Sequence, residues 1–158
     1  MANEFSTAGI VVRYATEATA GTRPSSGYKT IHGIKSIGDM NPEPGTIQVT
    51  DLGDTVWHRY IKGLKDMGGN IALTANFTSD FMTAWGSAVS AAVTAQASSK
   101  STWWEFNVPG LSKSFYMAGM PDEIGMPGVE VDEVFDGDVY IAPNKVEGWG
   151  TPSTSPVA

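Results

Sequence analysis

Apolar and polar residues alternate along this chain in short runs, and clusters of glycine and proline separate one run from the next. The runs lie at residues 9–14, 28–34, 46–51 and 70–77, and the second is weaker because Gly33 interrupts it. Neighbouring side chains of a β-strand point to opposite faces, so alternation with a period of two predicts strands buried on one side. The sequence therefore predicts a mainly β protein with many tight turns.

One segment, residues 80–98, departs from this alternation. It is rich in alanine, lacks proline, and follows Thr78 and Ser79, either of which can cap the first turn of a helix. We expect a single amphipathic helix here, with a nearly uncharged outer face. The apolar residues at helical spacing are Phe81, Trp85, Ala88, Val89, Ala92 and Val93.

The last third of the chain predicts further strands. Residues 101–108 and 112–119 flank a Pro109-Gly110 pair, which is typical of a hairpin with a type II turn. The longest alternating run follows at residues 129–141, and a short strand is expected at residues 144–149. The total is about eight strands and one helix, which fits one domain of 158 residues.

The charge is low and unevenly distributed. Charged residues make up only 17% of the chain, against about 25% in a typical soluble protein. The net charge of −7 arises entirely after residue 100, where Lys113 and Lys145 are the only basic residues. Such a chain lacks the basic patch with which proteins hold nucleic acid, whereas its uncharged polar surface suits packing against other protein.

The residues give no sign of a catalytic, cofactor or metal site. The chain has no cysteine, and its only histidines, His32 and His58, are far apart and outside any metal-binding motif. No nucleophile motif or phosphate-binding loop is present, so we expect neither an enzyme nor a cofactor. No signal peptide and no membrane span are expected either, which predicts a product that starts in the cytoplasm.

The run at residues 129–141 carries a row of carboxylates opposite its apolar face. If it forms one strand, the even positions Glu130, Asp132, Asp136 and Asp138 lie together on the side away from the core. An ordinary solvated face accounts for this row in an isolated monomer. If copies close into a ring with the row inside, it becomes an anionic wall that repels DNA.

Residues 52–67 form a long segment without clear alternation. Loops of this length are usually functional or disordered, and the aromatic and arginine content matches protein interfaces better than disorder. A loop that caps the core is the alternative, and an arm that contacts another protein is our preferred interpretation. The candidate contact residues are Asp54, Trp57, Arg59, Tyr60, Ile61, Leu64 and Lys65.

Four stretches of the chain together resemble the major tail tube proteins of siphophages, from about residue 9 to residue 149. They are NPEPGTIQVTDLGD, YIKGLKDMGGNIALTANFT with the following SDFMTAWGS, and WWEFNVPGLSKSFYMAG. The most specific part is residues 63–66 with the glycine and strand that follow. The resemblance implies a β-sandwich or split barrel with a flanking α-helix, and it carries over no catalytic residue.

The same resemblance implies a role in assembly. Six copies would form a ring, and rings would stack into a hollow tail tube whose lumen passes DNA without specific binding. The loop at residues 52–67 would reach the adjacent ring, with an N-terminal arm (residues 1–8) and a flexible C-terminal tail (150–158) flanking the 9–149 domain. Expected partners are the tape measure, tail terminator and distal tail proteins. The expected location is the virion tail, assembled in the bacterial cytoplasm.

Two other functions remain open from the sequence. The inner tube of a contractile tail or injection system would share the fold, and a sheath-protein gene beside this one would favour it. A carbohydrate-binding β-sandwich is suggested by five tryptophans, provided that Trp103 and Trp149 are exposed to solvent. Enzymatic activity has the least support, because no nucleophile and base emerge as a pair.

Overall fold

The computed structural model describes residues 4 and 6–154 of the chain. Residues 1–3 and 5 of the expected N-terminal arm and residues 155–158 of the expected tail lie outside this part. The strands, in chain order, are β1 (Val11–Thr16), β2 (Lys29–Ile31), β3 (Ile34–Ile37), β4 (Thr46–Gln48), β5 (Tyr60–Lys62), β6 (Ile71–Asn76), β7 (Thr102–Val108), β8 (Lys113–Pro121) and β9 (Asp136–Gly150). The helices are α1 (Ser79–Ala97) and the 3-10 turn η1 (Pro109–Leu111).

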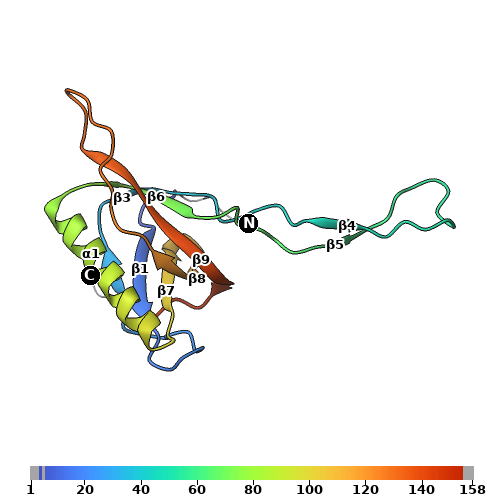
Figure 1. The fold of residues 1–158 in the computed structure, drawn as a ribbon, viewed down its shortest axis with the longest axis horizontal. Coiled ribbons are helices and arrows are strands. Elements are labelled where there is room, and N and C mark those ends of the chain that lie inside the picture. Colours follow the sequence, from blue (N-terminus) through green and yellow to red (C-terminus); the bar gives the residue numbers. More distant parts are fainter. Residues whose placement is uncertain (1–3, 5, 155–158) are drawn as a thin grey trace.

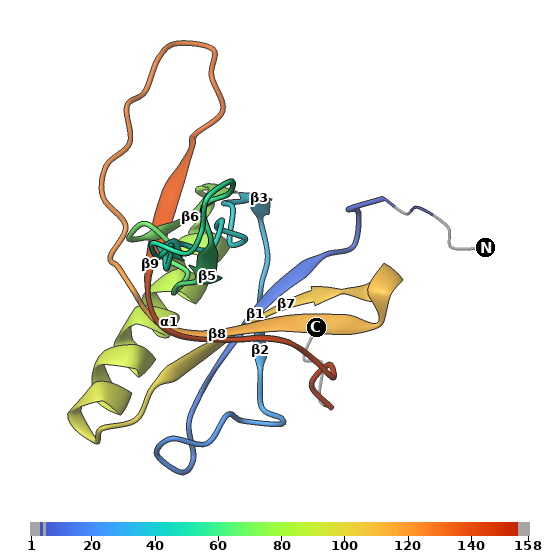
Figure 2. The same cartoon turned by 90° about the vertical axis from the view of Figure 1, so that its right-hand side faces the viewer.

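Seven strands form one antiparallel sheet in the order β2-β1-β7-β8-β9-β6-β3. Its two edge strands, β2 and β3, are consecutive in the chain and are separated only by His32 and Gly33. Because one short segment supplies both edges, the sheet curls back on itself as an open barrel (Figure 2). Gly33 allows this step with a φ of +92°, and its carbonyl accepts a hydrogen bond from the Asn76 amide at 3.1 Å. The predicted mainly β fold with one flanking helix is confirmed, with nine strands in place of about eight.

Helix α1 covers one side of the barrel (Figure 1) and matches the expected segment closely. Thr78 caps it, since its side-chain oxygen accepts a hydrogen bond from the Phe81 amide at 3.2 Å. The face toward the barrel buries Phe81, Trp85, Ala88, Ala92 and Ala95. Val93, which has helical spacing in the sequence, is instead exposed.

A chain of aromatic rings links the helix to the sheet. The ring centroids of Phe81 and Trp85 are 6.1 Å apart, those of Trp85 and Trp104 are 5.4 Å apart, and those of Trp104 and Tyr14 are 5.8 Å apart. Both indole N–H groups are satisfied by backbone carbonyls, so the rings are buried without an orphaned donor. Each fully buried large side chain contributes about 1.5–3 kcal/mol. This cluster is the main core of the barrel.

The hairpin of β7 and β8 forms as predicted, but its turn and its burial differ. Pro109–Leu111 is a single 3-10 turn, ended by Ser112 in the left-handed region with a φ of 52°, and not a type II turn. Trp103 and Trp104 point to opposite faces of β7, and both are buried because each face of the strand packs against a different core cluster. Trp103 packs in a second, smaller core that also contains Tyr28 and Tyr116.

The strand β9 is 15 residues long and unites two predicted pieces. It joins the end of the 129–141 run to the short strand expected at residues 144–149. Two register shifts against β8 allow it to bend with the barrel. Its first part, up to Ile141, pairs with β6, and the part from Ile141 onward pairs with β8.

Candidate assembly interface

A long hairpin between β3 and β6, residues 38–69, projects from the barrel, and we call it the arm (Figure 1). Its strands β4 and β5 pair only with each other and form a separate two-stranded sheet. The pairing continues beyond both strands. The Val49 amide donates to the Arg59 carbonyl at 2.9 Å, and the Gly45 amide donates to the Leu64 carbonyl at 3.1 Å. The arm is therefore an extended ladder and not a loop that caps the core.

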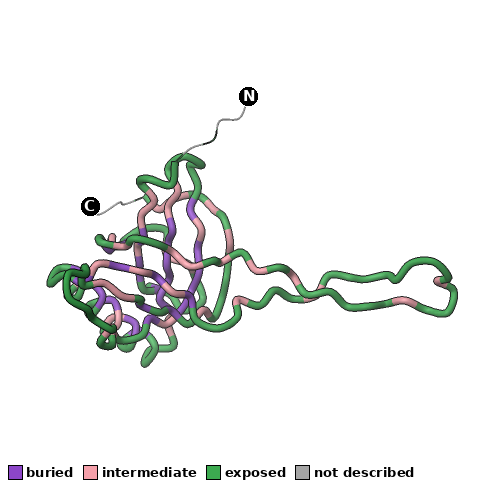
Figure 3. The backbone as a smooth tube through the Cα atoms, turned by 90° about the horizontal axis from the view of Figure 1, so that it is seen from above, coloured by how far each residue is buried: buried purple, intermediate pink, exposed green. Residues whose placement is uncertain are grey.

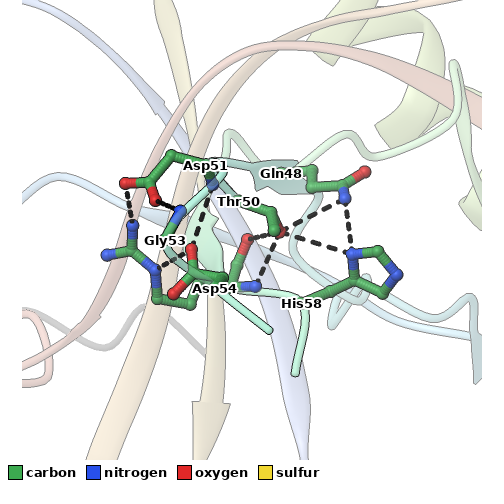
Figure 4. A network of polar contacts seen from close by, with 7 residues as sticks. Gln48, Thr50, Asp51, Gly53, Asp54 and His58 are labelled. Atoms are coloured by element: carbon green, nitrogen blue, oxygen red, sulfur yellow. Dashed lines mark hydrogen bonds and ion pairs between the residues drawn. The ribbon is translucent and has the colours of Figure 1, made fainter. Parts of the chain in front are cut away.

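A three-residue ionic network fixes the tip of the arm (Figure 4). Arg59 Nε lies 2.7 Å from Asp54 Oδ2, and Arg59 Nη2 lies 2.9 Å from Asp51 Oδ2. The Asp51 amide donates to Asp54 Oδ2 at 3.0 Å. This backbone hydrogen bond, followed by that from Arg59, lowers the pKa of the Asp54 carboxyl. The tip thus keeps a defined shape although it lies far from the core.

A second polar cluster joins the two strands just behind the tip. Thr50 Oγ1 accepts a hydrogen bond from the Arg59 amide at 2.9 Å and another from the Gln48 amide nitrogen at 3.2 Å. The same Gln48 nitrogen lies 2.8 Å from His58 Nδ1 (Figure 4). His58 is therefore one of the polar side chains that hold the two strands of the arm together.

Large apolar side chains of the arm face solvent. Nearly the whole arm is exposed, in contrast to the barrel (Figure 3). Trp57 is 82% exposed and Leu52 is fully exposed. A monomer gains nothing from apolar groups in water, and contiguous exposed apolar surface usually marks an interaction site. The predicted contact residues all lie on the arm: Asp54, Trp57, Arg59, Tyr60, Ile61, Leu64 and Lys65.

The four predicted acidic residues do not form one row. The strand β9 begins only at Asp136, so Glu130 and Asp132 lie in the loop 122–135, which projects from the barrel (Figure 2). The strand predicted over residues 129–141 is therefore wrong in its first half. The alternating valines of this half have no neighbouring sheet to cover them and are exposed. Asp132 adopts a left-handed φ of 64°, which a strand does not contain.

The other two carboxylates lie on the outer face of β9 and have partners. Asp136 forms an ion pair with Lys35 of β3. Asp138 accepts a hydrogen bond from the Thr74 hydroxyl at 2.6 Å. Lys35 neutralises the charge of Asp136. The remaining negative charge of the expected strip is therefore that of Asp138 and of the acidic residues in the loop 122–135.

A buried carboxylate that the sequence did not single out holds the C-terminal segment on the barrel. Glu105 of β7 is fully buried, and its Oε1 lies 3.1 Å from Arg13 Nη1. Ser153 donates to Glu105 through both its amide and its hydroxyl at 2.8 Å, and the Tyr116 hydroxyl donates at 2.9 Å. Burial by itself would raise the pKa of the Glu105 carboxyl, but the hydrogen bonds from Ser153, Ser114 and Tyr116 outweigh it and lower this pKa. The only sequence signal was an acidic residue within an aromatic strand.

Part of the expected loose tail is therefore ordered. The Tyr116 hydroxyl oxygen also lies 2.5 Å from the Thr151 carbonyl oxygen, and the Thr154 amide donates to the Ser25 carbonyl at 3.2 Å. Arg23 lies over the Tyr116 ring, 3.8 Å from its centroid, and forms an ion pair with Glu147. The described end of the chain is thus fastened across β7 and β8.

The exposure of the two tryptophans bears on the carbohydrate-binding alternative. Trp103 is only 2% exposed and donates from Nε1 to the Glu17 carboxylate at 3.0 Å, so it cannot be a sugar platform, whereas Trp149 is half exposed. Among residues 4 and 6–154, no group of histidines and carboxylates could hold a metal ion. No helix in this range is long and apolar enough to cross a membrane.

Comparison with known proteins finds a likeness in structure alone. The fold is similar to that of a chain in the cryo-electron-microscopy structure of the anti-feeding prophage baseplate, symmetrised six-fold, with a TM-score of 0.58. The match covers 94% of this chain and 97% of that chain, at 11% sequence identity. No protein-family model matches the chain. No curated protein matches it by sequence.

Proposed function

We propose that the chain is a structural, non-enzymatic subunit of a phage tail, and specifically a tail tube protein. Six copies close into a ring, and the rings stack into a hollow tube through which DNA passes without specific binding. The observation that carries this proposal is the arm, whose tip is ordered but whose apolar side chains lie in water. The fold that the chain shares with a component of a six-fold symmetrised baseplate supports it.

The exposed apolar surface of the arm contributes free energy only when another protein covers it. Burial of apolar surface is worth about 25 cal/mol per Å², and a monomer leaves that gain unused along the whole hairpin. A two-stranded hairpin alone in water is only marginally stable. Contact with neighbouring copies covers the arm, and the low charge of the outer surface keeps the cost of desolvation small.

The charge of the chain suits a conduit for DNA. With a net charge of −7, the protein repels phosphate instead of binding it. In the proposed tube, Asp138 and the acidic loop residues Glu130 and Asp132 face the lumen. The tape measure, tail terminator and distal tail proteins are the proposed partners of the tube in the virion, which is assembled in the host cytoplasm.

Electron microscopy of the purified full-length protein tests the proposal directly. We expect rings or stacked tubes in negative stain as the concentration is raised, and sixfold symmetry in averaged end views. A variant that lacks residues 46–62 should remain folded and monomeric under the same conditions. A wild-type protein that stays monomeric at high concentration, with and without the other tail proteins, would contradict the proposed function.

A charge reversal tests the position of the acidic residues. The triple variant Glu130→Lys, Asp132→Lys and Asp138→Lys should still form tubes but should impair DNA ejection, because lysines in the lumen would bind phosphate. The matched control places lysines at Thr83, Ser87 and Ser90 on the exposed face of α1. Normal ejection by the triple variant would show that these residues do not line the lumen.

The likeness to a baseplate component favours one alternative. The chain would then belong to the inner tube or baseplate of a contractile tail or injection apparatus, with the same fold and the same self-association. A sheath-protein gene next to the gene for this chain would support the alternative. Its absence, together with long tubes formed by the purified protein, would support the non-contractile tail.

A further inference from the structure

An apolar groove lies where the arm joins the barrel. It has a volume of about 700 Å³ and is open to solvent. Its lining combines residues of the arm root, such as Met40 and Met67, with Phe106, Phe115 and Trp149 of the barrel. Phe115 and Trp149 meet edge to face with centroids 5.5 Å apart, so the wall of the groove is already formed in the single chain.

The opposite end of the arm carries a matching apolar projection. Leu52, Val56 and Trp57 are all strongly exposed at the tip. The ion pairs of Arg59 with Asp51 and Asp54 fix the turn from which they project. A tip that is ordered before binding loses little conformational entropy when it binds, which is what an insertion element requires.

The tip cannot reach the groove of its own chain. The groove lies at the root and the tip at the far end of the extended hairpin (Figure 1). Trp57 and Met67 are ten positions apart in this extended segment, a span of roughly 33 Å at ~3.3 Å per residue. Contact between the two therefore requires two chains.

We infer that the groove receives the arm tip of a second copy of this chain, an inference that rests on the proposed self-assembly. The charges agree with this pairing. The tip has one excess negative charge from Asp51 and Asp54 against Arg59. The groove lining contains two charged residues: Glu147, which is ion-paired with Arg23, and Lys65, for which no ion pair is found among the described residues. The indole of Trp57 buries about 150–250 Å² when enclosed, and the groove is large enough to contain it.

The geometry also defines the kind of assembly. The tip of one chain occupies the root of the next, so the two contacting surfaces differ and the contact is heterologous. A heterologous contact generates a closed ring if its rotation closes and an open, repeating stack if it does not. Crosslinking through a ring stops at the number of chains in the ring, whereas crosslinking along a stack continues to longer species.

The absence of cysteine allows a direct crosslinking test in the full-length protein. The double variant Val56→Cys/Val146→Cys places one thiol at the tip and one in the groove wall. Oxidation of the assembled protein should give a ladder of covalent dimers, trimers and longer chains on a non-reducing gel. Each single variant should give no ladder, and neither should the control Val56→Cys/Ser87→Cys, whose second thiol lies on the outer face of α1.

A second measurement uses the tip itself. The variant Trp57→Asp should raise the concentration needed for assembly at least tenfold and keep the circular dichroism spectrum of the monomer. Trp57→Phe should assemble nearly as well as the wild type, and Leu111→Asp, a change to another exposed apolar residue, should not affect assembly.

The two proposals fail differently. If the wild type forms rings or tubes while the cysteine pair gives no ladder and Trp57→Asp assembles normally, the groove does not receive the tip, and the proposed function stands. If the wild type never assembles, both proposals are wrong. A ladder from the cysteine pair, together with assembly lost in Trp57→Asp and kept in Trp57→Phe, supports the tip-to-groove contact.

Discussion

The barrel and the arm place the same types of residue in opposite environments. In the barrel, Trp85 and Trp104 are fully buried and donate from both indole N–H groups to backbone carbonyls. In the arm, Trp57 and Leu52 are exposed, and polar contacts hold the tip of the hairpin in shape. The barrel thus contains what it needs to fold, whereas the arm is shaped for a surface that the single chain lacks.

This difference predicts two separate effects of mutation. Changes in the barrel should lower the stability of the monomer, and assembly should suffer only as a consequence. Changes at the arm should leave the stability of the monomer unchanged and affect assembly alone.

The largest effect on stability is expected at the helix–sheet contact. Trp85→Ala removes a fully buried indole and should lower the free energy of unfolding by about 3–5 kcal/mol. Trp57→Ala, the matched change in the arm, should alter it by no more than about 0.5 kcal/mol. Urea unfolding of both variants below the concentration of assembly measures this. Equal losses in the two variants would show that the arm packs on the barrel in solution.

The second largest effect is expected at the buried carboxylate. Glu105→Gln weakens the hydrogen bonds to Ser153 and the ion pair with Arg13, and should cost about 1.5–3 kcal/mol. Glu147→Gln is the control, because the ion pair of Glu147 with Arg23 is partly exposed and should cost less than about 1 kcal/mol. Chemical denaturation compares the two. A cost no greater than that of the control would mean that the C-terminal segment is not fastened by Glu105.

The sequence predicts the strands and the helix of the barrel better than the segment at residues 129–135, which projects from it. Alternation located β6 and the β7–β8 hairpin, and helical spacing with Thr78 located α1, because these local signals agree with the tertiary packing. Alternation failed at residues 129–135, where valines and acids alternate but no strand lies alongside. Period-two alternation shows which side chains would share a face if the segment were a strand. The segment becomes a strand of a sheet only where a neighbouring strand pairs with it.

The sequence locates the candidate interface along the chain but does not predict the contacts within it. Its length and aromatic content identified the arm, but the sequence does not show that Arg59 joins Asp51 and Asp54, since that contact depends on the register of the hairpin. The groove combines residues from both ends of the chain and has no local pattern at all. The ordering of Ser153 by Glu105 is likewise a long-range contact.

Acid should destabilise the barrel through Glu105 and Glu17. Hydrogen bonds outweigh burial at both carboxyls and lower each pKa below its ordinary value of 4.5 in the folded chain. A folded-state pKa that is lowered adds stability above the unfolded-state pKa, and this stability is lost as the pH falls through the folded-state value. We expect the melting temperature of the monomer to fall below pH 4.5, and to fall less in Glu105→Gln. Equal slopes in the two proteins would exclude Glu105 as a source of the acid sensitivity.

The smallest effect on the monomer is expected at the tip of the arm. Arg59→Ala removes both ion pairs of the tip and should leave the melting temperature unchanged, because no buried residue depends on them. Hydrogen exchange at the Asp51 amide, which donates to Asp54, should nevertheless become faster. Lys62→Ala, a change to a neighbouring exposed residue of β5, should alter neither quantity.

Measurements of assembly distinguish the effect of a fixed turn at the tip from the effect of the apolar side chains that the turn carries. Arg59→Ala keeps Trp57 and Leu52 but loses the fixed turn that presents them, so it should raise the concentration needed for assembly by a few fold, less than Trp57→Asp does. The extra cost is the entropy of ordering the tip on binding. If Arg59→Ala speeds exchange at the tip and assembly is unchanged, then the apolar side chains alone determine the contact. If it blocks assembly as fully as Trp57→Asp, the order of the tip matters as much as its apolar surface.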